Sequence, residues 1–256
     1  MRPEPSQPQI GAPAYWAQPL RPFTSLAFVI PLLLLYELGT AWLGPHAVRN
    51  GADLWMRGWL DRLGFSQHLL LPLLTCSLLL AWHHLQRHGW TFRWGVYYGM
   101  LLESLAFGSL LVMLAHAQGF VLAESTAQIE TSVPSTVAQA GLMIAYLGAG
   151  IYEELLFRLM LLPATAGLLR SAGLSSRTSW FSAILVTSLL FALAHYRLHL
   201  TVAGYPIALA YGDPFQWFSF VFRFLAGIIF ALLFVYRGFG IAAGTHALYD
   251  VFAATL

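Results

Sequence analysis

The sequence contains no lysine, only one cysteine, and few charged residues of any kind. Charged residues make up 9% of the 256 residues, whereas hydrophobic residues make up 58%. Soluble domains average about 25% charged residues, so this composition excludes an ordinary soluble domain and predicts an integral membrane protein. The single Cys76 excludes an internal disulfide and a cysteine-based metal site.

Positive charge is also too sparse to suggest a nucleic-acid partner. All 13 basic residues are arginine, and the formal net charge is only +2. No basic cluster is dense enough to follow a phosphate backbone, so we expect a lipid bilayer as the partner and no nucleic acid. The proline-rich start lacks the short apolar core of a signal peptide, and we interpret residues 1–22 as a flexible cytoplasmic tail.

Long apolar stretches dominate the rest of the chain. A helix needs about 20 apolar residues to cross the hydrocarbon core, and seven stretches approach this length, without the ten-residue alternation of a membrane barrel. The expected fold class is therefore all-α, a polytopic membrane helical bundle with about seven transmembrane helices. The stretches are residues 23–43, 67–85, 94–117, 139–162, 180–200, 215–236 and 239–256.

A short amphipathic segment, residues 52–63, separates the first two stretches. Trp55 and Trp59 recur at helical spacing with other apolar residues, while Asp53 and Arg57 are charged. This pattern is typical of a helix that lies at the membrane interface. We expect the segment to anchor the chain, with a gating role as the alternative.

Arginine placement predicts an orientation. With the N-terminus in the cytoplasm, seven arginines fall on the cytoplasmic side and four on the other side, which is the bias expected of membrane proteins. The first group is Arg2, Arg21, Arg87, Arg93, Arg170, Arg177 and Arg237, and the second is Arg49, Arg57, Arg62 and Arg197.

Three charges stand close together in the fourth stretch, within the run G-I-Y-E-E-L-L-F-R-L-M. An isolated charge at the centre of a membrane helix costs roughly 2.5–3.5 kcal/mol, so these side chains must pair or have a function. Glu154 and Arg158 are four residues apart with the acid first, which predicts an ion pair. Glu153 points to another face and is free to line a cavity. The alternative is a purely structural ion pair beside an idle acid.

Two further stretches carry ionisable groups, each with a partner at helical spacing. The fifth contains F-A-L-A-H, which places Phe191 and His195 on one face, and the seventh contains H-A-L-Y-D, which does the same for His246 and Asp250. A glutamate and a histidine that share one water molecule can remove its proton. A second histidine and a neighbour can hydrogen-bond the oxyanion that forms as water adds to an amide.

Other mechanisms are less well supported. No serine or cysteine stands beside a suitable base, which disfavours covalent catalysis. His195 and His199 have the spacing of zinc ligands on a helix, so a zinc-dependent membrane protease is the alternative mechanism, although no H-E-x-x-H motif occurs. We expect no metal and no other cofactor.

Several polar or small residues of the apolar stretches have no part in the mechanisms considered above. In the sixth, R-F-L-A-G includes Ala226 and Gly227, which would permit close helix packing. Glu37, Glu103 and His116 belong to no motif. We expect helix–helix hydrogen bonds for them, although Glu103 could instead face the internal cavity.

Taken in order, E-E-L-L-F-R, F-A-L-A-H, R-F-L-A-G and H-A-L-Y-D resemble the four motifs of the CPBP family. This family comprises CAAX prenyl proteases and bacteriocin-processing enzymes, also called Abi proteins, which are intramembrane glutamate endopeptidases. The resemblance covers about 110 residues and implies a membrane-embedded protease, with a peptide or protein substrate that is lipidated in the CAAX branch. The bacterial branch of the family would place the chain in an inner (plasma) membrane.

The resemblance also implies roles for individual residues. Glu153 and His195 would activate the attacking water, and His246 with Asp250 would form or support the oxyanion hole. Glu154 belongs to the catalytic motif and, with Arg158, would hold the site in shape, supported by Phe191. Well-studied eukaryotic-type members carry asparagine in place of Asp250. This aspartate would therefore either stay protonated because its surroundings are apolar, or serve to orient His246.

The sequence leaves the arrangement of the chain partly open. We divide it into the tail, N-terminal transmembrane helices with the interfacial helix at residues 23–138, and a catalytic CPBP-like core at residues 139–256. A non-catalytic immunity or scaffold protein and a proton-coupled transporter are the remaining alternatives, although no repeated half is present. The expected helix ends place Glu153 about nine residues deep and His195 about fifteen, a mismatch of roughly 9 Å.

Overall fold

A computed structural model describes most of the chain. The described residues are Tyr15 and the ranges 21–65, 69–87, 89–121, 136–202, 205–209 and 212–255. Most of the tail proposed for residues 1–22 lies outside the described residues. The helices are α1 (Pro22–Leu43), α2 (Gly51–Arg62), α3 (Leu70–Leu85), α4 (Trp94–Val121), α5 (Thr136–Glu154), α6 (Leu162–Ser171), α7 (Ser176–Leu193), α8 (Trp217–Arg237) and α9 (Phe239–Thr255).

The predicted all-α membrane bundle is confirmed. Each of the seven apolar stretches forms a helix, and the short segment between the first two forms α2. Within the described residues, five helical stretches are long and apolar enough to cross a membrane. Two of the seven helices are shorter, since α3 has 16 residues and α9 has 17.

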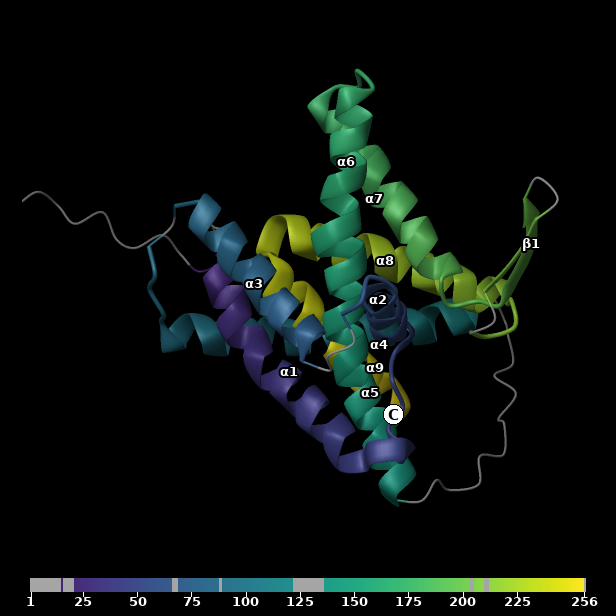
Figure 1. Ribbon diagram of the computed structural model, residues 1–256, viewed down its shortest axis with the longest axis horizontal. Coiled ribbons are helices and arrows are strands. Elements are labelled where there is room, and N and C mark those ends of the chain that lie inside the picture. The colour runs from purple at the N-terminus through teal and green to yellow at the C-terminus, as the bar shows by residue number, and fades with distance from the viewer. Residues whose placement is uncertain are drawn as a thin grey trace, which may run out of the picture.

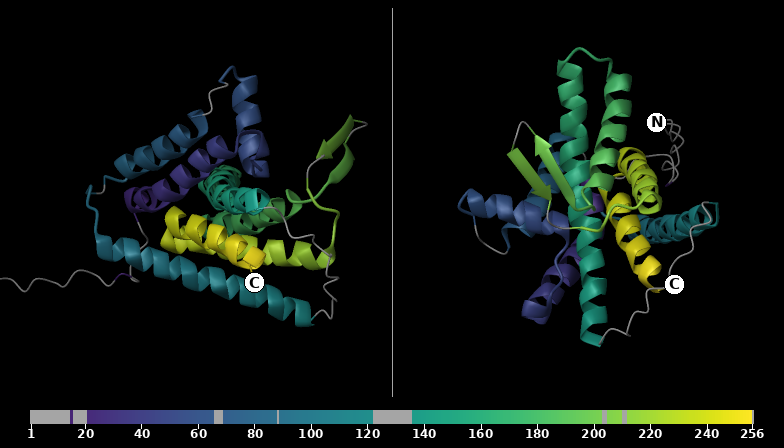
Figure 2. Two further views of the ribbon diagram at one scale, coloured as in Figure 1. Left: turned by 90° about the horizontal axis from the view of Figure 1, so that it is seen from below. Right: turned by 90° about the vertical axis from the view of Figure 1, so that its right-hand side faces the viewer.

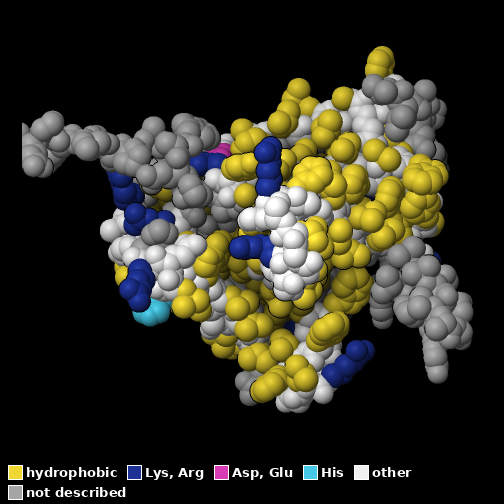
Figure 3. Space-filling model, turned by 90° about the horizontal axis from the view of Figure 1, so that it is seen from above, with side chains coloured by type: hydrophobic (Ala, Val, Ile, Leu, Met, Phe, Trp, Pro, Cys, Tyr) yellow, Lys and Arg dark blue, Asp and Glu magenta, His cyan; other side chains and the backbone are white. Residues whose placement is uncertain are grey.

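The surface is that of a protein embedded in lipid. Apolar side chains cover much of the face shown in Figure 3, where basic side chains are scattered and acidic ones almost absent. On α1, Leu34, Leu35 and Leu38 are all more than half exposed. Apolar patches of this extent are rare on soluble monomers, so these side chains are placed to contact acyl chains.

A single helical stretch from Thr136 to Ser171 runs vertically through the view of Figure 1, from α5 at the bottom to α6 at the top. A π-helical segment, η3 (Leu155–Leu161), joins α5 to α6 without a break. The expected end near residue 162 was therefore wrong. The helix passes Pro163 because this proline lies in the first turn of α6, where it interrupts no regular α-helical hydrogen bond.

The chain then reverses into α7, and the tip of α6 and α7 projects beyond the other helices (Figure 1). Gly173 has a φ of +95°, which favours glycine at the reversal. Ser175 caps α7, its hydroxyl oxygen accepting a hydrogen bond from the Thr178 amide at 3.2 Å.

The fifth apolar stretch was expected to stay helical to residue 200, which was wrong. The helix α7 ends at Leu193, and the strand β1 (Leu198–Val202) pairs with the antiparallel strand β2 (Tyr205–Leu209). The segment L-H-L-T-V alternates apolar and polar residues and ends in two β-branched ones, which favours a strand. The hairpin points away from the helices (Figure 1).

The helices pack in layers around α9. Figure 2 shows α9 between α4 on one side and α5 on the other, with α8 beside it. Gly150 allows α5 to approach α9 closely, because a Cβ atom there would lie 2.6 Å from the carbonyl oxygen of Ala243 and from Ala247. Gly227 does the same between α8 and α7, where a Cβ would lie 3.1 Å from that of Ser188, as its place in R-F-L-A-G predicted.

The helix α2 lies against α1 and α5 with its charged side inward. Asp53 is fully buried and accepts hydrogen bonds from Tyr36, Arg49 and Arg57. Leu54 and Trp59, by contrast, are exposed. Such an arrangement suits a helix whose apolar side meets lipid and whose charges pair inside the protein.

The same charges tie α2 to the neighbouring helices. Glu37 of α1 accepts hydrogen bonds from Arg57 at 2.8 Å and from the Tyr152 hydroxyl of α5 at 2.5 Å. We name this set the α2 latch. It consists of Tyr36, Glu37, Arg49, Asp53, Arg57 and Tyr152.

Candidate active site

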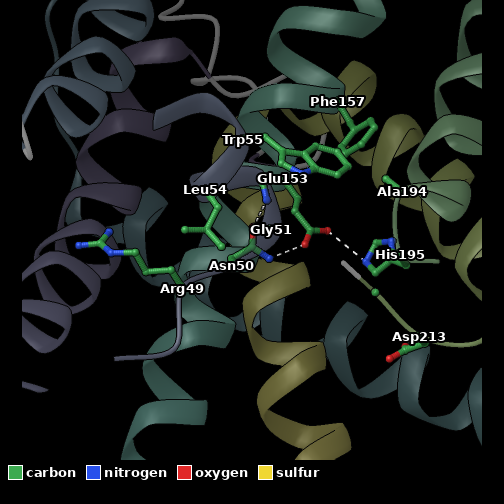
Figure 4. A pocket seen from close by; sticks show the side chains of 12 residues that line it. Arg49, Asn50, Gly51, Leu54, Trp55, Glu153, Phe157, Ala194, His195 and Asp213 are labelled. Carbon is green, nitrogen blue, oxygen red and sulfur yellow. Dashed lines mark hydrogen bonds and ion pairs between the residues drawn. The ribbon is translucent and has the colours of Figure 1, made fainter. Parts of the chain in front are cut away.

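Glu153 lies near the middle of the molecule, at the end of α5, with its carboxylate turned toward two partners (Figure 4). One oxygen, Oε1, accepts a hydrogen bond from the Asn50 amide at 2.6 Å. The other, Oε2, is buried without a hydrogen-bond partner and lies 3.5 Å from Nε2 of His195. As its position on the helix predicted, Glu153 lines a cavity rather than pairing with Arg158.

His195 follows the last turn of α7. Its Nδ1 lies 2.8 Å from the carbonyl oxygen of Phe191. A carbonyl can only accept, so Nδ1 carries a hydrogen, and in the neutral ring Nε2 is an acceptor. Two acceptors, Nε2 of His195 and Oε2 of Glu153, therefore face each other. A molecule with two O–H donors, such as water, matches this pair.

The continuous α5–α6 helix removes the expected difference in depth between these residues. Glu153 lies 18 residues before the end of α6 at Ser171, and His195 lies 19 residues after the start of α7 at Ser176. Because α6 and α7 form a hairpin, equal counts bring the two side chains to one level. The depth expected for Glu153 was wrong because its helix was predicted to end near residue 162, whereas it continues to Ser171.

His246, on α9, is held from the side opposite the cavity. Its Nδ1 lies 2.8 Å from Oε1 of Glu154, and the same oxygen lies 3.1 Å from Nη1 of Arg158. The predicted Glu154–Arg158 ion pair is thus confirmed, and it extends to a histidine that the sequence did not link to it. Glu154 accepts the Nδ1 hydrogen, which leaves Nε2 of His246 directed toward Glu153 and Asp250.

Asp250 lies one turn beyond His246 on the same helix. Its Oδ2 is 3.6 Å from Nε2 of His246, on the cavity side of the ring. Nε2 of His246 is 3.9 Å from Oε2 of Glu153. The side chain bonded to the ring through Nδ1 is therefore Glu154, and Asp250 lies near Nε2 on the cavity side.

Aromatic rings enclose these charges. The guanidinium of Arg158 lies 4.2 Å from the centre of the Phe191 ring, and its Nη2 donates to the carbonyl oxygen of Gly227 at 3.1 Å. Phe191 also contacts the His195 ring edge-on. The ring of Phe230 is stacked on His246 at 4.5 Å. Arg158 and Phe191 thus pack against each other between Glu154 and His195.

Two cavities meet at Glu153 and His195. One, of about 290 Å³, extends past Trp55 and Phe157. The other, of about 470 Å³, extends past His246 and Asp250. Glu153 and His195 line both, as do Arg49 and Asn50. An extended chain that crosses this junction would pass the acid and both histidines.

The structure does not place His195 and His199 at the helical spacing that made them candidate zinc ligands. His195 lies in the turn after α7 and His199 in β1, so the two do not share a helix. Among the residues that the structure describes, no three His, Cys, Asp or Glu side chains are arranged as ligands of one metal ion.

The acids outside the motifs form helix–helix contacts. Glu103 of α4 pairs with Arg237 of α8 at 2.7 Å and accepts from the Tyr15 hydroxyl, so it does not join the cavity. Glu37 is part of the α2 latch. His116 lies 2.9 Å from the carbonyl oxygen of Val112 within its own helix, so the expected bond between helices was wrong for this residue.

Two site residues were missed in the sequence, Asn50 and Phe230. Asn50 stands just before α2, where an asparagine signals a helix cap, but nothing in the sequence brings it to Glu153, 103 residues away. Phe230 is one of many aromatic residues in α8, and only the fold places it on His246.

A comparison with known protein families finds a match in the C-terminal part of the chain. Residues 135–252 match the family model described as type II CAAX prenyl endopeptidase Rce1-like. Residues 135–252 thus form a CAAX-protease-like domain. The domain contains Glu153, His195, His246 and Asp250, and it confirms the family resemblance seen in the motifs.

This domain and the apolar helices of the chain together indicate an integral membrane protease. No curated protein and no solved structure matches the chain. The 46–62 segment that supplies Asn50 and α2 lies outside the matched region.

Proposed function

We propose that this protease is a metal-free glutamate endopeptidase in which Glu153 and His195 activate the attacking water. The observation that carries the proposal is that two acceptor atoms, Oε2 of Glu153 and Nε2 of His195, face each other 3.5 Å apart. A water molecule that donates one hydrogen to each has its oxygen lone pairs free for a carbonyl carbon. Removal of one proton by the pair leaves hydroxide to attack.

The other side of the site would stabilise the tetrahedral intermediate. Nε2 of His246, when it carries a hydrogen, is directed toward the place where the oxyanion forms. Glu154 and Arg158 fix the ring from behind. Asp250, in its protonated form, could donate a second hydrogen bond. As the C–N bond breaks, the proton taken from water passes from the Glu153–His195 pair to the leaving amine, so that no net proton is gained or lost.

The substrate, in this proposal, is an extended peptide segment that crosses the junction of the two cavities. Cavities on both sides of the catalytic pair suit cleavage within a chain rather than release of a terminal residue. Apolar walls suit a lipidated or membrane-anchored peptide, and the CAAX relationship favours a prenylated cysteine three residues before the C-terminus. We assign catalysis to residues 139–256, with a cytoplasmic N-terminus in a bacterial inner membrane.

The direct test is cleavage of defined peptides by the purified chain in lipid vesicles. Two peptides would differ only in whether the cysteine that precedes the last three residues is farnesylated. Mass spectrometry should show release of the last three residues from the farnesylated peptide by the wild type and not by Glu153→Gln. Equal cleavage by Glu153→Gln would reject the proposal, and preference for the unmodified peptide would reject the prenylated substrate class.

A further inference from the structure

Asn50 contacts the carboxylate of Glu153 from outside the CAAX protease domain. Its amide nitrogen donates to Oε1 of Glu153 at 2.6 Å, while its amide oxygen accepts from the backbone N–H of Ala52 at 2.8 Å. The second bond is the cap of α2. Because a backbone N–H can only donate, the amide oxygen must face it, which leaves the amide nitrogen for Glu153.

This bond decides which oxygen of Glu153 is available. A carboxylate can rotate, and either oxygen could then face His195. With Oε1 engaged by Asn50, Oε2 remains 3.5 Å from Nε2 of His195 and has no hydrogen-bond partner of its own. The carboxylate is thereby held with one oxygen toward the position of the water molecule.

The α2 latch explains why Asn50 stays in place. Arg49, which directly precedes Asn50 in the chain, forms an ion pair with the buried Asp53 at 2.8 Å. Arg57, one turn later, joins Asp53 to Glu37 of α1. Tyr152 bonds to Glu37 and directly precedes Glu153. The cap of α2 and the start of the catalytic motif are therefore fixed to the same buried charges.

We propose that Asn50 is a positioning residue for Glu153 and that α2 holds it there through the latch. This inference rests on the proposed role of Glu153. Asn50 acts through the carboxylate, so its loss should lower kcat and leave KM near the wild-type value. A hydrogen bond to a charged group is worth roughly a 10- to 100-fold change in rate, which is the expected loss in kcat.

The decisive variant is Asn50→Ser. Serine caps helices about as well as asparagine, but its hydroxyl is too short to reach the Glu153 carboxylate while it caps. We expect a melting temperature close to the wild type in detergent and a kcat lower by the stated factor. Ser175→Ala is the matched control, because it removes the cap of α7 at the exposed end of that helix and should leave kcat and KM unchanged.

Two results would overturn the inference. One is a wild-type kcat in Asn50→Ser while Glu153→Gln is inactive, since the proposed function would then stand without Asn50. The other is a raised KM with unchanged kcat, which would mean that Asn50 contacts the substrate. If Asn50→Ser fails to fold, Asn50→Thr also caps a helix and is likewise too short to donate to Glu153, and the same loss in kcat is expected. Turnover by Glu153→Gln would instead reject the proposed function itself.

Discussion

At the scale of single residues, two adjacent acids meet different partners because a helix turns by about 100° per residue. Glu153 faces His195 and the cavities, whereas Glu154 faces Arg158 and His246. One carboxylate is left with an unbonded oxygen, and the other is shared between a guanidinium and an imidazole. The two should therefore respond differently to the same substitution.

Glutamine at each position tests this difference. Glu153→Gln can still accept from Asn50, so it should melt near the wild-type temperature while turnover falls at least roughly 100-fold. Glu154→Gln leaves Arg158 buried without a counter-charge, and breaking a buried pair costs about 3–5 kcal/mol. It should lower both the melting temperature in detergent and the cleavage rate. Turnover by Glu153→Gln beside a stable but inactive Glu154→Gln would show that the roles are exchanged.

Asp250 allows a second test at this scale. Its Oδ2 lies 3.6 Å from Nε2 of His246, on the side of the oxyanion. Asp250→Asn keeps a group that can donate to the oxyanion and should retain substantial activity, whereas Asp250→Leu should lose most of it. Initial cleavage rates under saturating substrate decide the matter. Equal inactivity of both variants would mean that the negative charge is required and that the oxyanion-side assignment is wrong.

At the scale of elements, the site depends on how closely α5 and α9 approach. Glu153 and Glu154 end α5, and His246 lies on α9, so the spacing of these helices sets the distances between their side chains. Gly150 is a point of close approach, because a Cβ there would meet the backbone of α9. A small separation of the helices would break the Glu154–His246 contact.

Gly150→Ala should therefore reduce both stability and activity. The added methyl group would lie 2.6 Å from the Ala243 carbonyl oxygen, and overpacking of this kind costs about 1–3 kcal/mol. Gly167→Ala is the matched control, because open space surrounds that position in α6. It should be neutral or stabilising by up to about 1 kcal/mol from helix propensity. Equal melting temperatures and rates for the two variants would show that close packing at Gly150 is unimportant.

Elements could be predicted from the sequence where local patterns decide them. Apolar length predicted a helix in each of the seven long stretches, and the four-residue spacing predicted the pairing of Glu154 with Arg158. The hairpin β1–β2 was missed because its short apolar segments fit either a helix or a strand. The extension of α5 into α6 was missed because the π-helical segment carries the chain past Pro163.

At the scale of the whole molecule, the site joins residues that are far apart in the chain. Four motifs could be recognised in order, but their convergence depends on helix ends that were predicted incorrectly by several residues. The contact of Asn50 with Glu153 spans 103 residues and depends on the α2 latch. Such a contact leaves no local pattern, which is why the sequence indicated α2 as an anchor, with gating as the alternative, and did not link it to Glu153.

The central claim is that a glutamate and a histidine, rather than a metal ion, activate the water. The most direct measurement is the cleavage rate of the farnesylated peptide after exhaustive chelation, with the metal content of the same sample determined. We expect an unchanged rate in metal-free protein, because Oε2 of Glu153 and Nε2 of His195 suffice to take the proton. Loss of activity that returns only when zinc is added back, with stoichiometric binding, would contradict it.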